Sequence, residues 1–383
     1  MYLKRLNLRQ FRNYQDCLVN FETPKTILVG NNAQGKSNLL EAVELLSTLR
    51  SHRSVRDREL VLEDASICQI QAILERAYGS VELGLTLRSQ GRRTVALNRE
   101  SLRRQLDFLG ILNTVQFSSL DLDLVRGSPE RRRNWLDSIL TQLEPVYAYI
   151  LQQYNQVLRQ RNALLKTMGK QQEDGTKNGV LSSKPPQAEL SLWDAQLATA
   201  GSRVTRRRAR VLQRLAPLAQ SWHASISGKT ELLEVTYAPN VNLEKDDPKG
   251  VQQAFLDKLY HRRLPEQRQG ITLVGPHRDD VEFTINQTPA RSYGSQGQQR
   301  TLVLALKLAE LKLIEEVVGE PPLLLLDDVL AELDPNRQNQ LLDAIQDRFQ
   351  TLITTTHLGA FDSQWLNSSQ ILSVQAGQIQ PLG

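Results

Sequence analysis

The sequence predicts an α/β fold in which both ends of the chain contribute to one domain and the middle forms a mainly α-helical insertion. At each end, a short apolar run leads into polar residues: residues 25–29 precede a glycine-rich loop, and residues 323–326 precede two aspartates. Between them, a helical period runs from about 128 to 168 and resumes at Ser191. This order is typical of a sheet domain interrupted by helices.

The composition is that of a globular protein. The chain has 383 residues, of which 40% are apolar and 23% charged, so two or three domains with a sizeable core are expected. No run approaches the roughly 20 apolar residues of a membrane span, and MYLKRLNLRQ lacks the apolar segment of a signal peptide. We therefore expect a cytoplasmic protein with no membrane partner. Cys17 and Cys68 lack metal-ligand spacing and are predicted core thiols.

The first elements are strands and one helix. Residues 2–8 alternate in polarity as a strand does, and KTILV ends at the loop that precedes a helical pattern of leucines and Val43. Residues 67–98 predict three antiparallel strands, with turns at AYGS and SQGRR. The predicted head domain comprises residues 1–110 and 271–383, with an antiparallel β subdomain at about 65–100.

The predicted insertion covers residues 111–270. Its first helix follows Ser128, a residue type that caps helices, and a proline at the first helical position. Residues 169–188 are polar and rich in Gly, Ser and Pro, which predicts a mobile loop. The next helix is expected to begin at Ser191, with Asp194 as its capping-box partner.

The remaining elements complete the insertion and then return to the head domain. ELLEVTY predicts a strand, residues 250–263 a helix, and residues 271–285 a hairpin. A helix is expected from Ser295 to Gly319, followed by the strand LLLL and by a second strand at TLITTTHL.

Positive charge is concentrated in the insertion. The whole chain carries +5 with a pI near 9.2, but residues 126–214 hold 16 Lys and Arg against 7 Asp and Glu. This excess indicates a polyanion, most simply nucleic acid, although solvated helix faces rich in arginine are the alternative. The candidate phosphate contacts are Arg131, Arg132, Arg133, Arg203, Arg206, Arg207 and Arg210. No base-reading motif is visible, so little sequence preference is expected.

The glycine-rich loop carries the strongest motif. Gly30, Asn31, Asn32, Ala33, Gln34, Gly35, Lys36 and Ser37 fit G-x-x-x-x-G-K-S between a strand and a helix. In this motif the backbone wraps a phosphate at the helix N-terminus. Lys36 would reach the β- and γ-phosphates, and the Ser37 hydroxyl would bind Mg²⁺. The cofactors predicted are therefore ATP and Mg²⁺.

Two acids and a histidine follow predicted strands. Asp327 ends the leucine strand, which places its carboxylate at the sheet edge where the loop lies and makes it a second Mg²⁺ partner. Asp328 is the candidate to orient or deprotonate the attacking water. His357 is a candidate phosphate contact. The alternatives are a helix or turn cap for the acids, including Asp334, and a structural role for the histidine.

The turn Ser295-Gln296-Gly297-Gln298 has two compatible interpretations. Ser295 and Gln298 have capping-box spacing, and most such pairs only cap a helix. A helix N-terminus of small residues is also an anion site. The chain would then hold two phosphate-binding elements about 260 residues apart.

The motifs resemble a known family in their order. GNNAQGKS, SQGQ, LLLLDD, AELD and TTTH resemble the ABC-type ATPases, in the branch that includes structural-maintenance-of-chromosomes (SMC) heads. LRQFRNY, NNAQGKSNLLEA, SHRSVRD, GSPERRR, RNALL, GPHRDD and LLLDDVLAELD resemble the RecF family of recombinational repair. These stretches span residues 3 to 357, and their joint order is highly specific.

This resemblance implies an ABC-type ATPase head, an ATP-dependent homodimer, and a role at gapped or junction DNA with RecO and RecR before RecA loading. It also implies residue roles. The turn Ser295 to Gln298 would be the signature motif that faces the partner subunit's ATP, Asp334 the D-loop acid and His357 the switch histidine. Arg12 and Asn13 in FRNY would lie against the nucleotide.

Two positions depart from the ABC pattern. Asp328 stands where most ABC enzymes carry Glu, so slow hydrolysis is expected, and Gln116 is the only candidate for the glutamine at the entry to the helical lobe. Two other functions stay open: an SMC-like scaffold that binds ATP without significant turnover, and the motor subunit of a transporter. The basic insertion disfavours the transporter.

Overall fold

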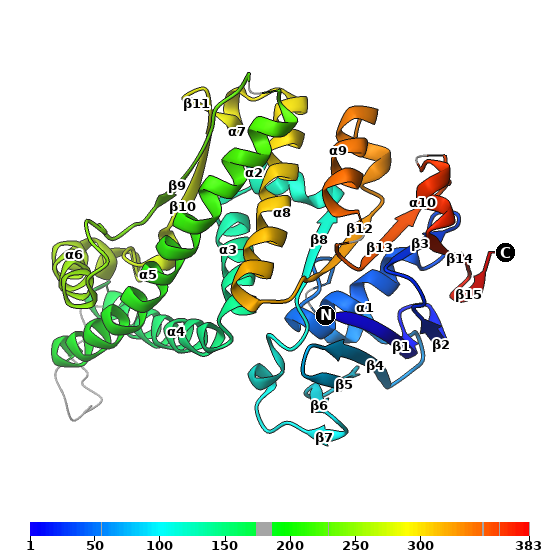
Figure 1. Ribbon diagram of the computed structural model, residues 1–383. Helices are drawn as coiled ribbons and strands as arrows, with labels where there is room; N and C mark the ends of the chain where they lie inside the picture. The colour runs from blue at the N-terminus through cyan, green and yellow to red at the C-terminus, as the bar shows by residue number, and fades with distance from the viewer. Residues whose placement is uncertain (55, 174–185, 229, 347, 360, 383) are drawn as a thin grey trace.

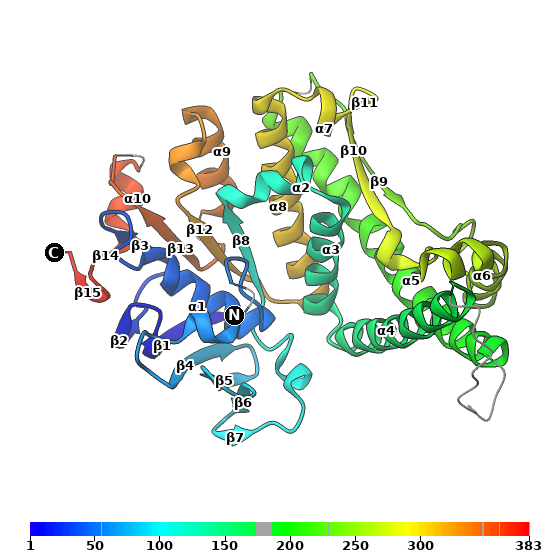
Figure 2. The ribbon, with the colours of Figure 1, turned by 180° about the vertical axis from the view of Figure 1, so that it is seen from behind.

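The computed structural model describes residues 1–54, 56–173, 186–228, 230–346, 348–359 and 361–382. Two six-stranded sheets form a head, and long helices extend from it as an arm (Figures 1 and 2). The α/β class with a helical insertion is thus confirmed. Within the described residues, no helix combines the length and apolar character needed to cross a bilayer.

The first sheet is antiparallel and comes from the N-terminal part of the chain. Its order is β2-β1-β4-β5-β6-β7, formed by β1 (Tyr2–Phe11), β2 (Tyr14–Asn20), β4 (Ile67–Arg76), β5 (Gly79–Arg88), β6 (Thr94–Leu97) and β7 (Glu100–Ser101). The strand predicted at 2–8 and the three antiparallel strands at 67–98 are confirmed. Cys17 and Cys68 are both buried here.

The second sheet joins the two ends of the chain. Its order is β15-β14-β3-β13-β12-β8, formed by β3 (Lys25–Val29), β8 (Thr114–Ser118), β12 (Leu323–Asp327), β13 (Thr351–Thr355), β14 (Ser369–Gln375) and β15 (Gln378–Pro381). All neighbours are parallel except β14 and β15. Because β8 pairs with β12, the head extends past the predicted boundary at residue 110.

Helix α1 (Lys36–Thr48) packs between the two sheets, against β12, β13 and β8 on one side and β5 on the other. Leu39, Leu40, Leu45 and Leu46 are fully buried there. A helix that is apolar on nearly all sides fits such a position. The helix that follows the glycine-rich loop is therefore rigidly held.

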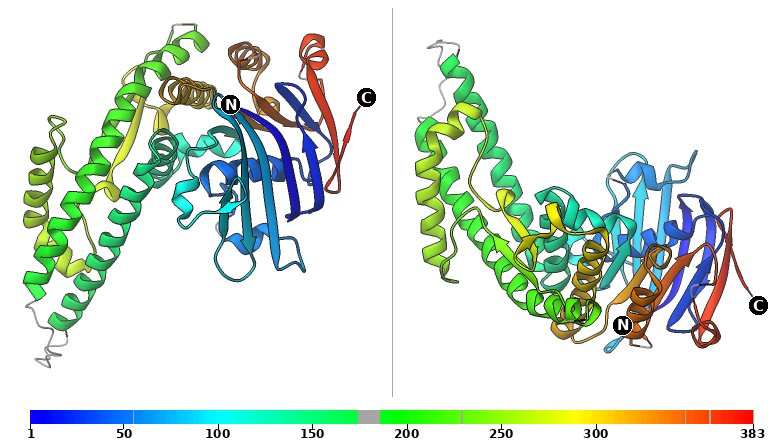
Figure 3. Two further views of the ribbon diagram at one scale, coloured as in Figure 1. Left: turned by 60° about the horizontal axis from the view of Figure 1, so that its bottom comes forward. Right: turned by 90° about the horizontal axis from the view of Figure 1, so that it is seen from above.

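The arm consists of α3 (Pro129–Leu143), α4 (Val146–Glu173), α5 (Pro186–Ile226) and α6 (Pro248–Gln269). Figure 3 shows α4 and α5 side by side, extending away from the sheets, with α6 beside their outer parts. Of the loop predicted at 169–188, residues 169–173 end α4, residues 186–188 begin α5, and the rest lie outside the described residues.

The predicted capping box at Ser191 is wrong. Helix α5 begins at Pro186, and Asp194 instead accepts hydrogen bonds from Arg161 and Arg263 at 2.8 Å each. Arg161 is fully buried and also donates to Glu266 at 2.6 Å. A buried arginine requires such acidic partners, because an unpaired charge in the interior is strongly destabilising.

The hairpin predicted at 271–285 is also wrong. Strand β10 (Asp280–Ile285) pairs antiparallel with β9 (Leu233–Ala238) and with the short β11 (Thr288–Pro289), while residues 271–275 form no strand. Gly275 has φ 128°, and a 3₁₀ turn, η4 (Pro276–Arg278), follows it. A left-handed glycine followed by proline interrupts extended structure.

The remaining helices lie where the arm meets the head or connect strands of the second sheet. They are α2 (Asp123–Arg126), α7 (Ala290–Tyr293), α8 (Gln296–Val318), α9 (Pro335–Ile345) and α10 (Ser363–Asn367), with short 3₁₀ turns at η1 (Asp57–Leu60), η2 (Gln105–Phe108), η3 (Ser119–Leu122) and η5 (Leu330–Glu332). Helix α8 lies between its caps Ser295 and Gly319, as predicted, and packs along α5. It is the main contact between arm and head.

Candidate functional site

The predicted phosphate loop lies at the carboxyl edge of the parallel sheet, between β3 and α1. The Lys36 side chain is buried, and its Nζ donates to the carbonyl oxygens of Gly30 and Asn31 at 2.8 and 2.9 Å. Helix α1 has no side-chain cap. The free backbone N–H groups of its first turn and the ammonium group therefore converge on the loop, which suits a phosphate.

Both motif glycines are needed for steric reasons. Gly35 has φ 116°, and a Cβ there would lie 2.7 Å from the amide nitrogen of Asn13. At Gly30 a Cβ would lie 2.4 Å from the carbonyl oxygen of Val374 in β14. The Val374 oxygen is a backbone atom that cannot easily move aside, and the positive φ of Gly35 would strain any residue with a Cβ. The loop geometry thus depends on contacts from both ends of the chain.

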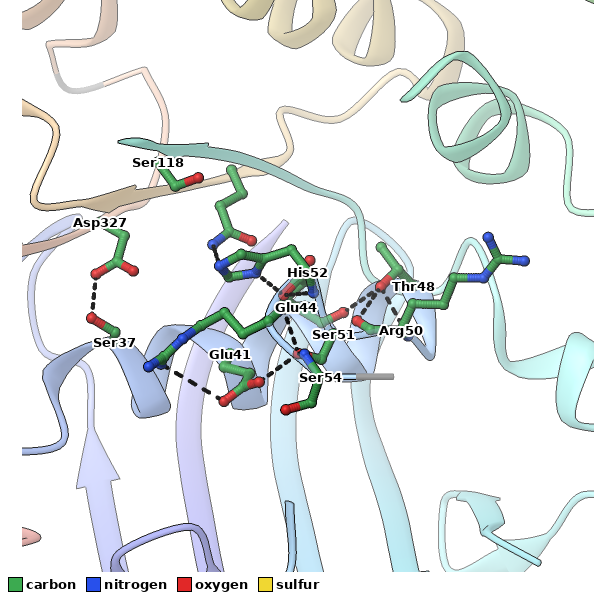
Figure 4. A network of polar contacts seen from close by, with 12 residues as sticks. Ser37, Glu41, Glu44, Thr48, Arg50, Ser51, His52, Ser54, Ser118 and Asp327 are labelled. Atoms are coloured by element: carbon green, nitrogen blue, oxygen red, sulfur yellow. Dashed lines mark hydrogen bonds and ion pairs between the residues drawn. The ribbon is translucent and has the colours of Figure 1, made fainter. Parts of the chain in front are cut away.

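Ser37 and Asp327 meet as predicted for an Mg²⁺ pair. The Ser37 hydroxyl donates to Asp327 Oδ1 at 2.6 Å (Figure 4). The hydroxyl of Thr354 donates to the same oxygen at 2.8 Å. The described residues contain no group of three or more His, Cys, Asp or Glu that could hold a metal. Mg²⁺ fits this site nonetheless, because it is commonly held by one or two protein oxygens together with phosphates and water.

Asp328 and His357 follow the neighbouring strands β12 and β13 at the carboxyl edge of the parallel sheet. Asp328 has φ 54°, and burial raises its pKa, with Asp327 adding to the effect and Lys36 opposing it. A carboxylate with a raised pKa is a better proton acceptor than an ordinary carboxylate. His357 is exposed, two residues past β13, and its backbone is held by the Thr355 hydroxyl. Both positions are compatible with their predicted roles.

Arg12 and Asn13 support the loop and α1. The Arg12 guanidinium binds both carboxylate oxygens of the fully buried Glu41, at 2.9 and 2.7 Å. Asn13 donates to the carbonyl oxygen of Gln34 at 2.9 Å and accepts from the Asn38 amide at 2.8 Å. These contacts within the protein are enough to explain why an arginine and an asparagine occur at positions 12 and 13. Direct nucleotide contact stays a prediction.

Sequence reasoning missed a polar network on α1 and the segment after it. His52 Nδ1 lies 2.7 Å from Glu44 Oε2, and its Nε2 lies 3.3 Å from the Gln116 amide (Figure 4). Burial opposes the imidazolium, but the hydrogen bond and charge of Glu44 outweigh it and raise the pKa of His52. The motif SHRSVRD contained the signal, but nothing in it showed that His52 meets Gln116.

Gln116 is therefore bound to a specific partner near the loop. It lies on β8, two positions before the edge occupied by Asp327. Its Oε1 is buried without a hydrogen-bond partner among the described residues. A cavity of about 510 Å³, lined by Gln116, His52 and residues of α3, opens beside it. Whether Gln116 acts as the glutamine of the helical lobe stays a prediction.

The capping box at Ser295 is confirmed. Ser295 Oγ accepts from Gln298 N at 3.2 Å, and Gln298 Oε1 accepts from Ser295 N at 2.8 Å. Ser295 and Gln296 are exposed, and Gly297 is half-buried. Among the described residues, no hydrogen bond or ion pair joins this turn to the phosphate loop of the same chain. The turn is therefore free to face another molecule.

Arg337 connects the D-loop acid to this turn. Asp334 caps α9 by accepting from Arg337 N at 3.2 Å, and its carboxylate pairs with the Arg337 guanidinium. The same guanidinium donates to Gly297 O at 3.2 Å and to the Thr301 hydroxyl at 2.9 Å. Asp334 is thus a helix cap, as the alternative held, and Arg337 also links it to the turn Ser295 to Gln298. Sequence reasoning did not single out Arg337.

The predicted DNA-contacting arginines differ in accessibility. Arg132 is only 3% exposed and binds both oxygens of Asp280, so its prediction as a DNA contact is wrong. Arg203 and Arg131 are exposed, and Arg131 has only a distant ion pair with Asp123 at 3.9 Å. The others have partners on the protein: Arg206 and Arg210 pair with Asp246, Arg207 pairs with Glu144, and Arg133 donates to the Asp279 carbonyl.

Comparison with known proteins gives consistent matches. The family model described as "RecF/RecN/SMC N terminal domain" matches residues 2–379. The "DNA replication and repair protein RecF" of Gloeothece citriformis is 72% identical over 99% of this chain and 100% of the relative. The protein of the same name from Nostoc punctiforme is 71% identical and is covered completely, as is this chain.

Solved structures agree with this result. A structure described as "Structure of the recombination mediator protein RecF-ATP in RecFOR pathway" is 31% identical, with a TM-score of 0.89 over 100% of this chain and 98% of that one. An SMC head bound to the C-winged helix domain of ScpA, at 16% identity and a TM-score of 0.56 over 100% and 97% of the two chains, shares the fold alone. This chain therefore belongs to the RecF family of DNA replication and repair proteins, within the ABC/SMC-like ATPase superfamily.

Proposed function

We propose that this protein is an ATP-dependent DNA-binding protein of recombinational repair and replication-fork recovery. It works as a homodimer closed by two ATP molecules, binds gapped or double-stranded DNA without sequence preference, and hydrolyses ATP slowly with stimulation by DNA. It promotes RecA loading together with RecO and RecR. The relatives' names and the described RecF-ATP structure support the pathway and the nucleotide.

One observation supports the proposed homodimer. The phosphate loop, with its Ser37–Asp327 pair, and the exposed Ser295 turn both have the geometry of a phosphate site, yet no described contact joins them within one chain. A two-fold arrangement uses both, because Ser295 of one subunit then faces the triphosphate held by the partner's loop. ADP lacks the terminal oxygens, so the dimer loosens after hydrolysis.

Hydrolysis is expected to depend on Asp328. Changing Asp328 to Asn removes the proton acceptor while keeping the size, and should lower the turnover number by about 10²-fold or more. ATP affinity should remain near the wild-type value, because Lys36 and Ser37 are untouched. Steady-state phosphate release and equilibrium ATP binding measure the two effects. Equal losses of affinity and turnover would instead assign Asp328 to nucleotide binding.

DNA binding is expected to be electrostatic. Affinity for duplex DNA with ATP present should fall steeply between about 50 and 200 mM salt, because phosphate contacts release counterions. Arg203→Gln should reduce the salt slope by about 1. Arg206→Gln is the matched control on the same helix face, since Asp246 already binds its guanidinium at 2.5 Å. A salt-independent or sequence-selective binding curve would contradict the proposal.

Phosphate release with and without DNA tests the function itself. The proposed protein turns over faster when gapped or duplex DNA is added. An SMC-like scaffold would bind ATP and DNA without significant turnover under either condition. The transporter alternative is disfavoured, because the insertion that would meet a membrane partner carries the exposed arginines Arg131 and Arg203.

A further inference from the structure

The signature turn is tied to the arm by one side chain. The carboxamide of Gln298 has two bonds: its oxygen accepts from Ser295 N, and its nitrogen donates to Glu231 Oε1 at 2.8 Å. Both the oxygen and the nitrogen of the Gln298 carboxamide are therefore hydrogen-bonded, and the second partner lies 67 residues earlier in the chain. A capping box needs only the first of these two bonds.

Glu231 belongs to the segment that joins α5 to β9. It lies between the end of α5 at Ile226 and the start of β9 at Leu233. Its side chain is 21% exposed, and its Oε2 lies 3.7 Å from Nε2 of His223 on α5. His223 is fully buried. One carboxylate thus contacts the long arm helix on one side and the signature turn on the other.

The packing of α5 against α8 connects the Glu231–Gln298 hydrogen bond to the arm. Helix α5 carries the candidate DNA-contacting Arg203 and packs along α8, whose first turn is the signature motif (Figure 2). A shift of α5 relative to α8 changes the distance between Glu231 and Gln298 directly. The charge on Glu231 strengthens the bond relative to a neutral pair, so the contact resists such a shift.

We propose that Glu231 is a positioning residue that couples DNA binding on the arm to ATP hydrolysis at the signature turn. It touches neither nucleotide nor DNA and acts through the Gln298 carboxamide. This inference rests on the proposed function, since it supplies the route by which DNA stimulates turnover. Coupling of this kind is reciprocal: ATP must raise the affinity for DNA by the factor by which DNA raises the affinity for ATP.

The test compares Glu231→Ala and Glu231→Gln with the wild type. Phosphate release at saturating ATP is measured with and without duplex DNA, and DNA affinity with and without ATP. The alanine variant should lose roughly 2- to 30-fold of the DNA stimulation and of the ATP-dependent gain in DNA affinity. The basal rate and the DNA affinity without ATP should stay at wild-type values. Glutamine retains an acceptor oxygen and should keep an intermediate stimulation.

Glu234→Ala is the matched control. Glu234 lies on β9 three residues further on, and its carboxylate accepts a hydrogen bond at 2.9 Å from the hydroxyl of Thr284 on the paired strand β10. DNA should stimulate phosphate release by the Glu234→Ala variant as strongly as it does for the wild type. Wild-type stimulation in Glu231→Ala, or an equal loss of basal and stimulated rates, would overturn the coupling role alone. A wild-type protein without DNA stimulation would instead overturn the proposed function.

Discussion

Changing Lys36 to alanine is expected to abolish ATP binding at concentrations that saturate the wild type and to lower turnover by at least about 10²-fold. The reason is local. The ammonium group is the one buried cation at the centre of the loop between Gly30 and Ser37 among the residues described, and its Nζ lies within 2.9 Å of two loop carbonyls. Without it, the phosphate charge would be balanced only by backbone dipoles and the metal ion.

Calorimetric titration with ATP and phosphate release measure the two losses. Lys4→Ala is the matched control, because Lys4 is an exposed lysine on β1 that pairs with Glu75. It should bind ATP normally. Dimerisation with ATP should also disappear in Lys36→Ala, since the dimer depends on bound nucleotide. If Lys36→Ala bound ATP as the wild type does, the assignment of the loop would be wrong.

Changing Ser295 to arginine should abolish the ATP-dependent dimer while each monomer still binds ATP. Ser295 is exposed, and among the described residues no hydrogen bond joins it to the phosphate loop of its own chain, so the nucleotide pocket should be unchanged. In a two-fold dimer, the long arginine side chain would enter both of the equivalent contacts between a Ser295 turn and the partner's phosphate loop. A loss of at least ~2 kcal/mol at a central interface position is expected, which corresponds to a roughly 30-fold weaker dimer.

Light scattering with ATP, ADP or no nucleotide measures this effect. Ser295→Ala serves as the control for the lost helix cap, which stabilises α8 by about 1 kcal/mol. It should weaken the dimer far less than arginine does. An arginine variant that pairs with ATP as well as the wild type would exclude this turn from the interface. Wild-type particles that stay single with ATP would defeat the dimer proposal itself.

The phosphate site was predictable because its determinants are local in sequence. Gly30 to Ser37 form one loop between a strand and a helix, and Asp327 ends an apolar strand, so both positions follow from the edge of a parallel sheet. The contacts of Gln116 with His52 and of Arg337 with Gly297 were not predictable. Each joins side chains from different elements whose packing no spacing rule describes.

The accessible charge of the arm also could not be predicted from the sequence alone. Residues 126–214 carry a net +9 in sequence, but acids from residues 246–280 neutralise much of this in space. Asp246 binds Arg206 and Arg210, Asp280 binds Arg132, and Glu266 binds the buried Arg161. A count over a window of sequence cannot include acidic partners from later parts of the chain. The accessible positive charge is therefore smaller than the sequence indicates.

The pairing of β3 with β13 and β14 has a consequence for biosynthesis. Lys25 pairs with both Thr351 and Ser369, and the Leu3 backbone bonds the Gln350 side chain, so the loop is held by residues made more than 300 positions later. A nascent chain on the ribosome lacks these partners until translation is nearly complete, whereas the helices of the arm emerge with their neighbours. Products that terminate before β13 should therefore carry a folded arm and an incompetent nucleotide pocket.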